Sequence, residues 1–234
     1  MAMLIAAAAV FLAIHFLISG TRVRDVITGA IGEGPYLGMF SLASLAAIVW
    51  LAISYNHANG GPDDRQLYAL GPAVFHLAIP IVALAFFIGV QGLLGGGPTR
   101  VRGTVTGEET IHGVFHITRH PFLWSVVLWS GFHVAANGNL ASVIFFGTFF
   151  VLALFGTFLI DAKRKRKLGD AWNAFARKTS NIPFAAIVSG RTRLALGEDF
   201  GWRFWVAALI FVAVLFSHAR LFGVSPFPNG WRPF

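Results

Sequence analysis

The sequence predicts an all-α, polytopic membrane protein with six transmembrane helices in one domain, residues 1–234, and an additional cytoplasmic interfacial helix. Of the 234 residues, 56% are hydrophobic and only 12% are charged, whereas a typical soluble domain has about a quarter charged residues. Apolar runs near the ~20 residues that a spanning helix needs also recur along the chain. The chain has no cysteine, which excludes disulfides, thiolate metal sites and thiol nucleophiles.

The predicted spans are separated by segments with clear turn signals. Pro121 suits the first turn of a helix, where its missing N–H costs nothing, and the Asn-Gly-Asn turn at 137–139 favours a tight reversal. The first apolar run has no basic segment before it, so it is predicted to be a helix of the mature protein rather than a signal peptide. The spans cover about 2–19, 37–55, 72–94, 121–136, 140–160 and 202–217.

The distribution of Lys and Arg predicts the orientation of the six spans. Six crossings place loops 1, 3 and 5 on one side and both termini on the other. Fifteen of the 18 Lys and Arg residues fall in loops 1, 3 and 5 when Arg203, at the loop-5 end of the last span, is included. Arg100, Arg102 and Arg119 are those of loop 3. Because basic loops stay in the cytoplasm, both termini should face outward from a bacterial inner membrane. The net charge of +8 then reflects topology rather than nucleic-acid binding.

The long fifth loop predicts the interfacial helix, over about 162–179. Leu168, Trp172 and Phe175 share one helical stripe, and the basic run KRKRK at 163–167 lies elsewhere on the helix. An amphipathic, basic helix of this kind is typical of a membrane surface, where it meets anionic headgroups. The same basic run also serves as a topology signal, and the two interpretations are compatible.

Eight histidines divide by predicted depth. His15, His112, His116 and His120 lie toward the cytoplasmic side, and His57, His76, His133 and His218 lie toward the outer side. One histidine at a helix end is more often hydrogen-bonded than a ligand, but four in each half favour metal binding, since neutral imidazole is a common ligand. Imidazoles in an aromatic-rich helix bundle suit haem, while spacing alone leaves copper or no metal open.

Three segments resemble the NnrU family of bacterial membrane proteins, which shares a superfamily with the ζ-carotene cis–trans isomerase of plants and cyanobacteria. The segments are HFLISGTRVRD, HITRHPFLWSVVLWSGFHVAANGNLAS and LGDAWNAFARKTSNIPFAAIVSGR. The resemblance implies haem b, an apolar polyene substrate or a role in nitrite and nitric oxide metabolism, and an electron donor that reduces the iron. Membrane lipid is the other expected partner.

The resemblance also implies which residues hold the haem. It assigns the axial ligands to His15 and His133 and further cofactor contacts to Arg119 and His120. The planar fork of Arg119 suits a haem propionate, Asp161 or Asp170, and Arg191 is predicted to organise the same cytoplasmic face. His15 and His133 differ by ~15 Å in predicted depth at ~1.5 Å per residue. His133 could therefore pair instead with His57, His76 or His218.

Two other classes of function stay open on the sequence. Arg119-His120-Pro121 at a helix start, followed by a basic segment and Pro183, also resembles isoprenylcysteine and phospholipid methyltransferases, although the later helix lacks their glutamate. A non-catalytic accessory protein of denitrification is the third hypothesis. A visible absorption spectrum would separate the haem hypothesis from both alternatives.

Overall fold

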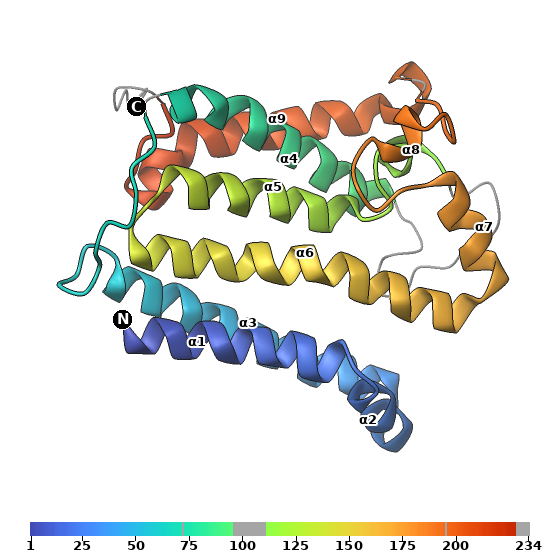
Figure 1. Ribbon diagram of the computed structural model, residues 1–234, viewed down its shortest axis with the longest axis horizontal. Helices are drawn as coiled ribbons and strands as arrows, with labels where there is room; N and C mark the ends of the chain where they lie inside the picture. The colour runs from blue at the N-terminus through green and yellow to red at the C-terminus, as the bar shows by residue number, and fades with distance from the viewer. Residues whose placement is uncertain (72, 96–110, 195, 228–234) are drawn as a thin grey trace. The chain divides into compact units, whose positions relative to one another are not determined.

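The structure is a computed structural model that describes residues 1–71, 73–95, 111–194 and 196–227 (Figure 1). All of its named elements are helices, which confirms the all-α class. The predicted loop-3 residues Arg100 and Arg102 lie outside the described residues. The elements are α1 (Ala2–Ala13), the π-helix η1 (Ile14–Ser19), α2 (Val23–Ile31), α3 (Glu33–Ala58), α4 (Ala73–Gly95), the 3₁₀ helix η3 (Gly113–His116), α5 (Pro121–Ala136), α6 (Leu140–Leu168), α7 (Asp170–Lys178), α8 (Ala185–Val188) and α9 (Leu196–Phe222).

Five of the described helices are long and apolar enough to cross a membrane: Ala2–Ser19, Glu33–Ala58, His76–Gly95, Leu140–Leu168 and Gly201–Phe222. They overlap five of the six predicted spans and show a membrane protein. The other predicted span, α5, is apolar but has only 16 residues. At ~1.5 Å per residue it is ~24 Å long, shorter than a ~30 Å hydrocarbon core.

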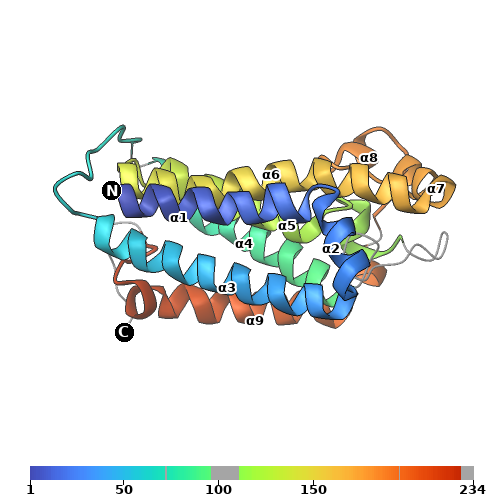
Figure 2. The ribbon, with the colours of Figure 1, turned by 90° about the horizontal axis from the view of Figure 1, so that it is seen from below.

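The chain forms two compact units, each built from two separate stretches of sequence. Unit 1 comprises Met1–Leu70 and His133–Leu152. Within it, α1 and α3 lie side by side (Figures 1 and 2). Leu4, Phe11, Leu51 and Ala141 belong to its buried apolar core.

Unit 2 comprises Gly71–Phe132 and Ala153–Phe234. Here α4 packs against α9 and against η3, and a second apolar core gathers around Ile88 and Phe115. Gly92 allows α4 to approach the start of α5 closely, because a Cβ there would lie 2.6 Å from Cγ of Pro121. Small residues at helix contacts are the usual device for close packing in membranes.

The structure corrects the bounds of the predicted interfacial helix. Helix α6 does not end near residue 160 but continues through the basic run to Leu168. No helix breaker interrupts this run, and Lys and Arg are good helix formers that also favour the C-terminal end of a helix dipole. The break comes at Gly169, whose φ of +53° suits glycine. A separate nine-residue helix, α7, then begins at Asp170.

The apolar stripe predicted for that helix packs inside the protein. Trp172 and Phe175 are only 3% and 2% exposed, and their rings contact each other at 5.5 Å. Side chains as buried as these are not free to enter lipid. The amphipathic pattern of α7 therefore reflects packing within unit 2.

Candidate functional site

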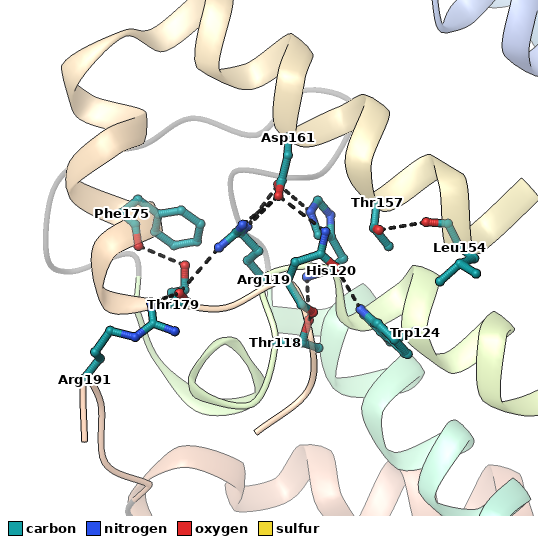
Figure 3. A network of polar contacts seen from close by, with 11 residues as sticks. Thr118, Arg119, His120, Trp124, Leu154, Thr157, Asp161, Phe175, Thr179 and Arg191 are labelled. Carbon is teal, nitrogen blue, oxygen red and sulfur yellow. Dashed lines mark hydrogen bonds and ion pairs between the residues drawn. The ribbon is translucent and has the colours of Figure 1, made fainter. Parts of the chain in front are cut away.

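A buried network of polar side chains surrounds Asp161 on α6 (Figure 3). Arg119 donates from Nε to both carboxylate oxygens at 3.0 Å and from Nη2 to Oδ2 at 2.6 Å. His120 donates from Nε2 to Oδ1 at 2.6 Å. Both donors come from the short segment that precedes α5. One carboxylate thus joins α6 to the start of α5, with the bidentate geometry that an arginine fork favours.

The segment between α7 and α8 closes around the same network (Figure 3). The backbone N–H of Arg119 donates to Ser180 O at 2.9 Å, and Thr118 Oγ1 donates to Asn181 O at 2.6 Å. The Asn181 side chain accepts from Trp124 Nε1 at 3.2 Å and donates to Asp161 Oδ2 at 3.4 Å. These hydrogen bonds connect the sequence segments 118–124 and 179–181.

Burial sets the protonation of His120. His120 is only 2% exposed, and this burial lowers the pKa of its ring. The hydrogen bond and the charge of Asp161 act to raise this pKa, and the charge of Arg119 acts to lower it further. The ring is therefore neutral at pH 7, with its proton on Nε2 facing the carboxylate. Its Nδ1 is buried without a hydrogen-bond partner and carries a lone pair. Chemically, this nitrogen can accept a proton or a hydrogen bond.

Two further contacts support the network. The guanidinium of Arg119 lies over the ring of Trp172, 5.9 Å from its centroid, which is within the range of a cation–π contact. Arg191 donates from Nη1 to Thr179 O at 2.9 Å and to Arg177 O at 3.2 Å. Arg191 thus pairs with carbonyls at the C-terminal end of α7 rather than with a carboxylate. Both arginines donate to Thr179 O at this end of unit 2, and their role in organising the cytoplasmic face stays a prediction.

His15, in unit 1, lies in the π-helix η1. Its Nδ1 donates to Phe11 O at 2.8 Å, because a carbonyl can only accept. The other ring nitrogen, Nε2, then carries the lone pair. The ring is flanked by Phe11 at 4.5 Å and Phe40 at 5.3 Å between centroids. Short π-helical segments occur often at functional sites, and a ring with one nitrogen bonded to a carbonyl has the tautomer that most metal-bound histidines show.

His133, also in unit 1, contacts the ring of Phe146 at 4.7 Å. A row of aromatic contacts extends from there to His15. Its successive centroid distances are 5.1 Å for Phe146–Phe145, 5.2 Å for Phe145–Phe149 and 5.7 Å for Phe149–Phe11. The two predicted axial ligands thus contact opposite ends of one row of four phenylalanine rings, and both lie in apolar surroundings.

The alternative ligands lie in different settings. His57 and His76 are exposed, and His218 is bonded from Nδ1 to Val224 O at 2.7 Å. In the part of the chain that the structure describes, no three His, Asp or Glu side chains gather closely enough to hold a metal ion. The predicted outer histidines therefore do not belong to a group of three metal ligands within the described residues. A haem needs only two axial ligands, so this observation does not test the haem prediction.

Arg119 and His120 were predicted to contact a cofactor, but their donors are directed at the protein. Three guanidinium nitrogens of Arg119 bind Asp161 or Thr179 O, and His120 Nε2 binds Asp161. A propionate would have to compete with an ion pair already in place. The geometry favours a positioning role, and their cofactor role stays a prediction.

Sequence reasoning named Asp161 only as one of two carboxylates that suit Arg119. It missed Asn181 and Thr179, which close the network. The available signal was the polar run Thr-Ser-Asn at 179–181, which precedes an apolar segment and lies in one of the family-like motifs. Polar residues held in a loop next to buried arginine and histidine are typical of such networks.

Comparisons with known proteins agree with these motifs. The family model described as NnrU protein matches residues 3–226. The chain belongs to the NnrU family. The chloroplastic 15-cis-zeta-carotene isomerase of Arabidopsis thaliana is 27% identical to it over 212 residues, which cover 86% of this chain and 56% of the relative. The isomerase of the same name from Zea mays is 34% identical over 82 residues, covering 35% of this chain and 22% of the relative.

This NnrU-family chain spans about half the length of the Arabidopsis relative. No solved structure matches it. The resemblance in the three quoted motifs is therefore confirmed at the level of family. Asp161, which lies between the second and third motifs in the sequence, binds Arg119 and His120 of the second and Asn181 of the third.

Proposed function

We propose that this chain is an integral membrane haem b protein that catalyses cis–trans isomerisation of an apolar polyene. The relatives named 15-cis-zeta-carotene isomerase support the reaction class. The observation that carries the haem proposal is the His15 ring, whose Nδ1 donates to Phe11 O at 2.8 Å and leaves the Nε2 lone pair for a metal. His133 is the proposed second ligand, and the phenylalanine row supplies apolar surroundings that suit a porphyrin.

The chain's own residues would bind the haem, exclude water and hold the fold around it. A reduced haem held by His15 and His133 would supply a Lewis acid toward the polyene. The rings of Phe11, Phe146 and Phe149 would exclude water from this region.

We also propose six crossings, with α5 as the sixth and both termini outside. Its 16 residues end at polar Asn-Gly-Asn, and a short apolar helix is accommodated by local thinning of the bilayer. Protease or tag accessibility in intact spheroplasts tests this orientation. Cleavage of the α7–α8 segment from outside, with a protected C-terminal tag, would contradict it.

The decisive first measurement is the visible absorption spectrum of the protein purified in detergent. A Soret band and pyridine haemochrome of b type are expected. A purified, folded protein with no haem after expression with a haem precursor would favour the methyltransferase or accessory hypotheses. Binding of S-adenosylmethionine by calorimetry would then separate those two.

Histidine variants test the ligands. His15→Ala and His133→Ala should each lose or shift the Soret band, whereas His57→Ala, at an exposed position, serves as the matched control. Intact haem spectra in His133→Ala would remove His133 from the site. Loss in His133→Ala and His57→Ala, with His15→Ala unchanged, would assign the haem to the outer histidines instead.

Activity is tested on the reduced, haem-loaded protein with a polyene that has a central cis double bond. Conversion to the all-trans form should be measured by chromatography and should depend on reductant. Haem binding without isomerisation, together with a spectral shift on adding nitric oxide, would favour the family's alternative role in nitric oxide metabolism.

A further inference from the structure

Residues 182–188, which include α8, expose large apolar side chains outside all five candidate spans. Ile182 is 61% exposed and Phe184 is 41% exposed. Val188, at 86%, is the most exposed large apolar side chain among the described residues. We refer to this stretch as the 182–188 segment. A surface with three such side chains within seven residues requires an explanation, because soluble surfaces rarely group them.

The backbone of the 182–188 segment fixes these side chains outward. Phe184 has φ of +66°, a left-handed conformation that bulky residues rarely adopt. Its N–H donates to Ile117 O at 2.8 Å, and its carbonyl accepts from the N–H of Val188 at 2.9 Å. Ala186 is fully buried and its N–H donates to Ser180 Oγ at 3.0 Å. The exposure is therefore imposed by the network of the site rather than by a loose loop.

The charged residues that flank the segment in the sequence have one sign. No Asp or Glu occurs between Asp170 and Glu198, whereas Arg177, Lys178, Arg191 and Arg193 all fall in that interval. Arg177 and Arg193 are exposed. Apolar side chains flanked by basic ones are typical of a surface that enters an anionic lipid interface.

Exposed tryptophans lie on a neighbouring element of the segment. Trp202 and Trp205, near the start of α9, are 62% and 72% exposed, and exposed tryptophans mark the interface between lipid and water. Helix α9 packs against η3, and Ile187 of α8 packs on the core that contains Val114 of η3. The 182–188 segment and the start of α9 thus share a neighbour at one end of unit 2 (Figure 1).

We propose that the 182–188 segment is a docking surface for anionic lipid of the cytoplasmic leaflet. Ile182, Phe184 and Val188 enter the boundary between headgroups and acyl chains, and Arg177 and Arg193 contact the headgroup phosphates. This surface replaces the predicted stripe of Trp172 and Phe175 as the lipid contact of loop 5. The inference rests on the proposed orientation, with loop 5 in the cytoplasm, but not on haem or on the proposed reaction.

The absence of native cysteine allows a direct test with single spin labels. Val188→Cys and Ile182→Cys are labelled in the full chain, reconstituted in nanodiscs of phosphatidylcholine with and without phosphatidylglycerol. Ala174→Cys, at an exposed position of α7, is the matched control. Labels at 188 and 182 should be more accessible to oxygen than to a water-soluble nickel chelate, and the label at 174 should show the opposite ratio.

The charge contribution is tested by adding Arg177→Gln and Arg193→Gln to the Val188→Cys protein. The label at 188 should become shallower in discs with phosphatidylglycerol and stay unchanged in phosphatidylcholine alone. Circular dichroism checks that each variant is folded. The proposal would be overturned if the label at 188 were as accessible to the nickel chelate as the label at 174. It would also be overturned if the label at 188 were protected from both reagents, as in a protein interface, or if its depth did not respond to lipid charge.

Discussion

Arg119 and Asp161, 42 positions apart, form a bidentate ion pair in which Nη2 donates to Oδ2 at 2.6 Å. Their side chains are 14% and 19% exposed, so the pair is largely removed from water. The same carboxylate accepts from His120 and Asn181. Loss of this one carboxylate would leave an arginine charge and two polar side chains without their partner.

Asp161→Ala should therefore destabilise the protein strongly. Removing one partner of a buried ion pair costs about 3–5 kcal/mol, and thermal unfolding in detergent, followed by circular dichroism, measures the loss. Asp170→Ala is the control, since Asp170 is exposed and should change stability by about 0.5 kcal/mol or less. Equal midpoints for the two variants would show that the network contributes little.

The lowered pKa of His120 predicts a pH dependence of stability. Burial lowers the pKa of His120 in the folded state below the unfolded value of 6.5. At low pH, the unfolded chain therefore binds a proton at His120 more readily than the folded chain does. Stability should therefore be constant above pH ~7 and should fall as pH drops below 6.5. The slope should be smaller in His120→Gln, which cannot titrate. An unchanged slope in this variant would assign the effect to other groups.

Gly92 should not tolerate a side chain. A Cβ there would lie 2.6 Å from Cγ and 2.8 Å from Cβ of Pro121, and 3.1 Å from the backbone nitrogen of Phe122. Gly92→Ala should lower stability by about 1–3 kcal/mol through overpacking. Gly147→Ala is the matched control in α6, where no atom lies within 4 Å of the new Cβ, and it should unfold no earlier than the parent. Thermal midpoints in the same detergent decide the comparison.

Asp64 should contribute stability through the start of α6. Its Oδ1 accepts from the N–H of Ala141 at 2.8 Å, and its Oδ2 accepts from the N–H of Gly60 at 2.8 Å. Desolvation acts to raise the pKa of Asp64, but these hydrogen bonds lower it below 3.8. The contribution of Asp64 to the free energy of unfolding is therefore present above pH 3.8 and is lost at lower pH. Asp64→Ala should cost about 0.5–2 kcal/mol at neutral pH.

The adjacent Asp63 provides the control for that measurement. Its carboxylate is 77% exposed and lies 3.9 Å from the N-terminal amine, an arrangement that contributes little. Asp63→Ala should match the parent within about 0.5 kcal/mol. If both substitutions had the same small effect, capping by Asp64 would not stabilise α6.

The sequence by itself determined the membrane class, the α-helices and the family, because long apolar runs and charge asymmetry are local properties of the chain. It also predicted that Arg119 would suit a carboxylate, with Asp161 among the candidates, because the planar fork of a guanidinium matches the two carboxylate oxygens. It misplaced the end of α6, because a continuous basic run is compatible both with a surface helix and with an extension of a spanning helix. Gly169 then sets the boundary through its positive φ.

Only the tertiary structure decided which partners meet. Asp161 is chosen over Asp170 because the last turns of α6 bring it to the start of α5, whereas Asp170 opens the separate helix α7. The same packing buries Trp172 and Phe175 and turns Val188 outward, although all three are apolar residues of one loop. Amphipathic spacing identifies a face, but the burial of that face depends on residues distant in sequence. Here these residues include Arg119, whose guanidinium lies over the ring of Trp172.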